Sequence, residues 1–112
     1  MIIRKSDNVE IENFQGDGAR GVKLQIMIGE PEGAPNFLMR RFTLEPGGHT
    51  PKHAHPWEHE IFVLEGTGTV FESGEERKIE AGDAVFVPPD EEHQFRAAPD
   101  STTIFLCLIP KL

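Results

Sequence analysis

The stretch from His49 to Gly66 reads HTPKHAHPWEHEIFVLEG and contains four of the five histidines in the chain. In an extended segment, side chains i and i+2 share a face, so His53 and His55 present two imidazoles to one side. After a turn at Pro56, His59 opens an alternating apolar strand and can return a third imidazole to the same place. Neutral imidazole is the commonest protein ligand for a transition metal, so this stretch predicts a metal site.

Outward from this stretch, short apolar runs alternate with Gly and Pro turns. Residues 22–28, 37–45 and 102–109 are expected to be strands, and we expect 59–65 to pair with 67–72. A convincing amphipathic helix of three turns is missing from the pattern. About ten short strands at regular spacing favour an all-β sandwich or small barrel. A length of 112 residues is typical of a single domain, here residues 1–112.

Composition excludes several classes of partner and architecture. A net charge of -8 without any basic run argues against nucleic acid and against an anionic membrane surface. A single cysteine, Cys107, excludes an intramolecular disulfide framework. The N-terminus becomes charged at once, and the longest apolar run, 104–109, is too short to span a bilayer. We therefore expect a cytoplasmic protein whose partner is a small molecule.

Two spaced motifs resemble those of the cupin superfamily. The first covers residues 47–66, with Gly47 six positions before the His53-Ala54-His55 pair and Gly66 at its end. The second covers residues 82–97, where Gly82, Pro88 and His93 fit the family spacing, whereas Asp90 and Ala97 replace the usual glycine and asparagine. The resemblance implies a single-domain jelly-roll β-barrel.

Three further segments, residues 34–37, 56–64 and 105–111, make the chain similar to a subgroup of small cupins with a four-histidine site. This resemblance implies a divalent transition metal in each subunit, with manganese expected first and iron next, and zinc, nickel or copper as further options. It also implies a homodimer and chemistry similar to that of oxygenases. The implied ligands are His53, His55, His59 and His93.

The fourth ligand has an alternative, because the family usually has a glutamate at this point of the motif. Six residues separate His59 from Gly66, as the motif requires, and only five separate Glu60 from it. A shift by one residue turns a strand side chain to the opposite face. We therefore expect His59 on the metal and Glu60 beside it as a carboxylate that orients imidazole N–H groups. His49 matches no ligand position and is expected at the rim.

The last strand offers candidate pocket residues. Phe105, Cys107 and Ile109 share one face of it and are expected to shape a substrate pocket beside the metal. The alternative for Cys107 is a small buried apolar thiol. Phe86 and Phe95 are expected in the core.

Four neutral imidazoles would leave the full +2 charge on a metal ion, which favours Lewis-acid chemistry. We expect a manganese- or iron-dependent oxidoreductase of the dioxygenase type, acting on a small, partly apolar enol, diketone or alkene. A non-catalytic binding or sensor module and a metal-assisted isomerase or decarboxylase are the alternatives. A fold alone does not choose among these functions.

Overall fold

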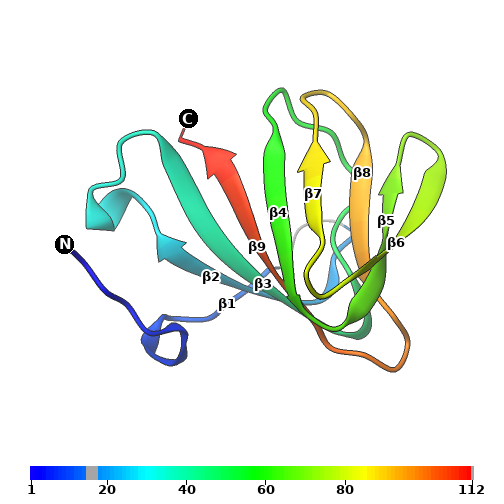
Figure 1. Ribbon diagram of the computed structural model, residues 1–112, viewed down its shortest axis with the longest axis horizontal. Coiled ribbons are helices and arrows are strands. Elements are labelled where there is room, and N and C mark those ends of the chain that lie inside the picture. Colours follow the sequence, from blue (N-terminus) through cyan, green and yellow to red (C-terminus); the bar gives the residue numbers. More distant parts are fainter. Residues whose placement is uncertain (15–17, 112) are drawn as a thin grey trace.

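The computed structural model describes residues 1–14 and 18–111, and most of these residues lie in β-strands. All the strands belong to one antiparallel sheet that curls on itself (Figure 1). Short 3-10 turns occur at Ser6–Asn8 and Glu30–Glu32. The predicted all-β barrel fold is confirmed.

The strands are β1 (Glu12–Asn13), β2 (Arg20–Ile28), β3 (Phe37–His49), β4 (His59–Glu65), β5 (Thr67–Glu72), β6 (Glu75–Glu80), β7 (Ala84–Val87), β8 (His93–Ala97) and β9 (Thr103–Pro110). The central path of the sheet runs β6-β5-β8-β3-β9-β4-β7, and β2 pairs with β1 and with β3.

The expected pairing of β4 with β5 is wrong. β4 pairs with β7 and β9, whereas β5 pairs with β6 and β8. A single residue, Gly66, links β4 to β5, and the common hairpin loops need at least two residues. Its backbone has φ 86°, so the chain turns sharply and β5 crosses to the other wall of the barrel. The turn at Ser73-Gly74, by contrast, does close a hairpin, between β5 and β6, with both residues at positive φ.

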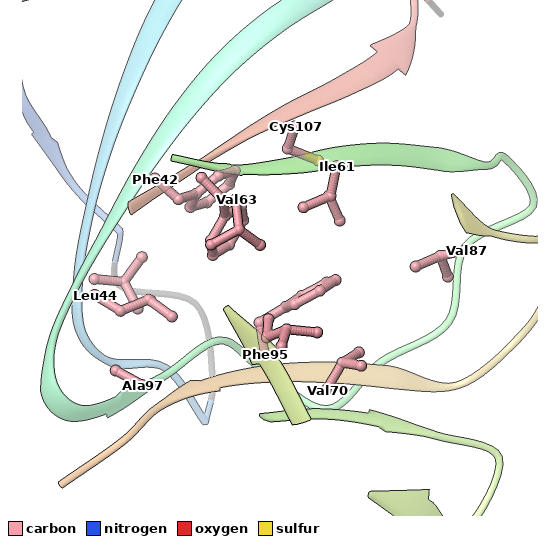
Figure 2. Close-up of a cluster of buried hydrophobic side chains, with 12 residues drawn as sticks. Phe42, Leu44, Ile61, Val63, Val70, Val87, Phe95, Ala97 and Cys107 are labelled. Atoms are coloured by element: carbon pink, nitrogen blue, oxygen red, sulfur yellow. The ribbon is translucent and has the colours of Figure 1, made fainter. Parts of the chain in front are cut away.

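Alternate residues of the curled sheet fill its interior, as Figure 2 shows. On β4 the burial alternates strictly, with Ile61 and Val63 inside and Phe62 outside. Leu44 and Val63 are fully buried, and Phe95 is buried as expected. The expectation for Phe86 is wrong, because its side chain is 59% exposed on the outer face of β7. Its neighbour in the chain, Val87, takes the inward position instead.

Within the ranges that the structure describes, no helix has the length and apolar character needed to cross a membrane.

Candidate metal centre

Four histidines reach the interior from three parts of the chain. His59 is the first residue of β4, and His93 is the first residue of β8. His53 lies in the loop between β3 and β4, and two backbone hydrogen bonds of 3.1 and 2.9 Å join it to His93. The carbonyl oxygen of His55 accepts a hydrogen bond from the amide of Asp90, 2.6 Å away. Backbone pairing therefore fixes the loop that carries two of the imidazoles.

Three of these side chains form a compact group. The candidate donor atoms of His53, His55 and His93 all lie within 4.8 Å of one another. The ring of His59 lies beside the group, with its centroid 4.7 Å from that of His93 and 5.4 Å from that of His55. Two nitrogens bound to one ion at about 2.1 Å can be at most about 4.2 Å apart, so the group is close to the spacing that an ion requires.

Hydrogen bonds set the tautomers that a metal needs. The Nδ1 atom of His93 lies 2.9 Å from the carbonyl oxygen of Glu91, which can only accept, so Nδ1 carries the proton and Nε2 has the lone pair. The Nδ1 atom of His59 lies 3.3 Å from the Sγ atom of Cys107, while its Nε2 is buried without a hydrogen-bond partner among the described residues. With the proton on Nδ1, His59 also presents a lone pair on Nε2.

Three of the imidazoles, those of His53, His55 and His59, have lowered pKa values. The pKa of His59 is lowered to about 3, mainly by burial and further by the charges of His93 and Arg40. Burial likewise lowers the pKa of His53 to about 4, and it lowers the pKa of His55. Because only neutral imidazole binds a metal, these side chains are in the binding form at neutral pH.

The histidines line a cavity of about 430 Å³ with largely apolar walls. It is lined by Phe14, Arg40, Phe42, Thr50, Pro51, Lys52, His53, His55, Trp57, His59, His93, Phe95, Phe105 and Cys107. The structure thus brings Phe105 and Cys107 to the histidines, as expected from the sequence.

Two residues expected at the site lie elsewhere. Glu60 is exposed, and it lines a separate outer hollow together with the half-buried Ile109. Glu60 faces outward because successive side chains of a strand point to opposite faces and its neighbour His59 takes the inward position. Instead of a carboxylate, the Nδ1 atom of His59 contacts the thiol of Cys107. His49 is half-buried next to the amide of Gln94 and is not among the cavity residues.

Sequence reasoning missed Arg40, which reaches the cavity from β3. It donates a hydrogen bond from Nη2 to the Sγ atom of Cys107 at 3.1 Å, since the two residues are register partners across β3 and β9. Strand parity was the available signal, because Arg40 shares a face with Phe42 and Leu44. Trp57, expected only to pack at the lip, stacks on the ring of His55 with centroids 4.4 Å apart.

Comparisons with known proteins agree with this architecture. A protein of known structure, the polyketide cyclase RemF from Streptomyces resistomycificus, is 35% identical and superposes with a TM-score of 0.93 over 98% of this chain and 79% of its own. The 1-methylthio-D-xylulose 5-phosphate methylsulfurylase of Rhodospirillum rubrum is 32% identical over 71 residues, which are 63% of this chain and 46% of that protein. The (R)-mandelonitrile lyase of Granulicella tundricola is 35% identical over 71 residues, covering 62% of this chain and 54% of that protein.

This chain thus spans about half the length of the curated relatives it matches. The family model described as "Cupin domain" matches residues 40–109, which include every histidine of the cavity and both sequence motifs. This chain belongs to the Cupin domain family.

Proposed function

We propose that this protein is a metal-dependent enzyme that acts on a small, partly apolar organic molecule. The observation that carries the proposal is the group of three imidazole donors within 4.8 Å, with a fourth buried imidazole beside it, at an apolar cavity. A buried ring nitrogen without a partner, Nε2 of His59, is costly unless something binds it.

The residues fit a divalent transition metal. His53, His55 and His93 would hold the ion, and His59 would complete the set as a fourth nitrogen ligand. When bound, such an ion supplies Lewis acidity that polarises a coordinated substrate oxygen. Imidazole ligands suit iron, zinc, nickel and copper, and metal supply in the cell decides among the candidate ions. We propose manganese first, because the resemblance to small four-histidine cupins implies it, and iron next.

The protein's own side chains hold and shape the centre. The carbonyl oxygen of Glu91 fixes the ring of His93, and Cys107 fixes the ring of His59. Phe42, Phe95 and Phe105 give the space beside the imidazoles an apolar lining. These features would orient a flat organic molecule against the ion.

Two reaction classes suit this arrangement. One is the oxidation expected from the sequence, of the dioxygenase type, with dioxygen or peroxide as oxidant. The other is an isomerisation, elimination or ring closure without an oxidant. The second is favoured by the relatives, since one is named a lyase and another a polyketide cyclase.

The test is a substrate screen with mass spectrometry on the metal-loaded protein. A panel of enols, diketones and hydroxynitriles is incubated with air and without it, and oxygen uptake is recorded. Product under both conditions identifies non-oxidative chemistry, whereas product that needs oxygen identifies an oxidoreductase. Saturable binding without any product across the panel would instead identify a binding or sensor module. His53→Ala is the matched inactive control.

We also propose that the protein forms a homodimer. Phe62, Leu64 and Phe86 are 44%, 43% and 59% exposed, and all three lie on the adjacent strands β4 and β7. A second copy that covers these side chains would remove apolar surface from water. Light scattering on the purified protein should give twice the mass of the chain, and Phe62→Glu should lower it. A monomer mass for the wild type would end this proposal.

A further inference from the structure

The cavity has an electrostatic character opposite to that of the whole chain. The chain has 19 acidic and 11 basic residues. Among the described residues, however, not one Asp or Glu lines the cavity, while Arg40 and Lys52 do. A cavity that contains cationic side chains and lacks carboxylates is selective for anions.

Arg40 is the side chain that could hold such an anion. Its guanidinium lies 5.0 Å from the centroid of the Phe42 ring and donates to the weak acceptor Sγ of Cys107. Its Nε atom is buried and has no hydrogen-bond partner among the residues described. Across residues 1–14 and 18–111, the one ion pair within 4.0 Å joins Arg4 to Glu32. Arg40 therefore has no carboxylate partner among these residues. A half-buried guanidinium without a counter-ion favours a ligand that supplies one.

Lys52 is less suited to this role. Its side chain is exposed, and Nζ lies 3.7 Å from the centroid of the Phe71 ring, which does not line the cavity. Arg40 in contrast lies close to the imidazoles, because its Nη2 atom and the Nδ1 atom of His59 lie 3.1 and 3.3 Å from the same Sγ atom of Cys107. Arg40 also lines the same cavity as the histidine group. One small molecule in the cavity can therefore contact Arg40 at one end and the histidine group at the other.

We propose that the cavity selects a substrate with a carboxylate group, which pairs with the guanidinium of Arg40 while its apolar part lies against Phe42, Phe95 and Phe105. A planar guanidinium matches the two oxygens of a carboxylate. A phosphate dianion normally receives several donors, whereas Arg40 is the one cationic side chain of the described lining that is even half-buried. The inference rests on the proposed function for the reaction, but the recognition of the anion rests on Arg40 alone.

The test compares benzoate with benzamide, two probes of the same shape that differ in charge. Calorimetric titrations use the full chain as purified and after metal removal by chelation, so that Arg40 can be separated from the metal. We expect benzoate to bind at least about tenfold more tightly than benzamide to the chelated wild type, as hydrogen bonds to a charged group imply. Equal affinity of the two probes for the wild type would overturn the proposal without any variant.

Variants then locate the charge that is recognised. Arg40→Met should abolish the preference for benzoate, and Arg40→Lys should retain part of it. Lys52→Met is the matched control and should leave the preference unchanged. If Lys52→Met abolishes the preference and Arg40→Met does not, the assignment to Arg40 is wrong.

A His53→Ala variant separates this inference from the metal-dependent function. It should bind the metal at least about tenfold more weakly and keep the preference for benzoate. A preference found in a protein that never binds metal would support Arg40 and remove the proposed function. A protein that binds metal but shows no preference for benzoate in its chelated form would support the proposed function and overturn the assignment to Arg40.

Discussion

Replacement of His59 by Ala, set beside replacement of its neighbour Glu60 by Ala, tests the centre most directly. The two residues are adjacent, but the His59 side chain is 5% exposed and lies among imidazoles, whereas Glu60 is exposed on the outer face of β4. We expect His59→Ala to weaken metal binding and Glu60→Ala to leave it unchanged.

The size of the effect follows from ligand linkage. A metal present at 100 times its dissociation constant stabilises the fold by about 2.7 kcal/mol. For a domain of this size each kcal/mol raises Tm by about 4 °C, so the wild type should gain about 10 °C. Loss of one ligand should cost at least about tenfold in affinity, or about 1.4 kcal/mol. The gain in His59→Ala should therefore fall to about half at the same metal concentration.

The assay combines elemental analysis of protein purified without added metal with thermal melting under manganese titration. His59→Gln, which retains a buried polar side chain of similar length, controls for the hole left by Ala. A full 10 °C gain in His59→Ala would refute its role as a ligand. Loss of the gain in Glu60→Ala alone would show that the carboxylate binds the ion, against the placement of the two side chains.

Three other perturbations test the surrounding structure. Because the folded-state pKa of His59 is lowered to about 3, its neutral form stabilises the fold fully above pH 6.5 and this stability is lost as pH falls toward 3. Chemical denaturation of the metal-free protein should show about 1 kcal/mol lost between pH 6.5 and 5.5 from His59, and more in total because the pKa of His53 is also lowered, to about 4. A flat profile there would contradict the neutral buried rings. Leu44→Ala, at a fully buried core position, should lower the free energy of unfolding, measured in urea, by about 3 kcal/mol. A decrease below about 1 kcal/mol would contradict a core position for Leu44. Gly66 has φ 86°, and Gly66→Ala would place a Cβ against the carbonyl oxygen of Thr102, so the melting temperature should fall. A melting temperature equal to that of the wild type would contradict the sharp turn.

Local patterns in the sequence were sufficient for most of the strands. The alternation in 22–28 and 59–63 predicted strands there correctly. Burial follows the alternation in 59–63 but not in β2, where Gln25 is buried and Ile26 and Ile28 are 38% exposed. The motif spacing to Gly66 favoured His59 over Glu60, and in the structure His59 is inward and Glu60 is outward. The prediction for Phe86 was wrong, because its hydrophobicity alone did not reveal which face of β7 was inside.

Strand pairing and the partners of the site came only from the tertiary structure. Pairing of β4 with β9 brings together residues 39 to 48 positions apart, which no local pattern encodes. That crossing places Cys107 against His59 and, through β3, Arg40 against Cys107. Their meeting depends on the closure of the whole barrel, which is a property of long-range packing.

The sequence by itself therefore determined the type of fold and the histidines available as ligands. Both depend on residues near one another in the chain, where spacing and strand parity fix which side chains share a face. Only the tertiary structure decided that a half-buried arginine, which has no carboxylate partner among the described residues, faces the same cavity as those histidines. The reason is that Arg40 lies on a strand whose neighbours are set by the closing of the sheet.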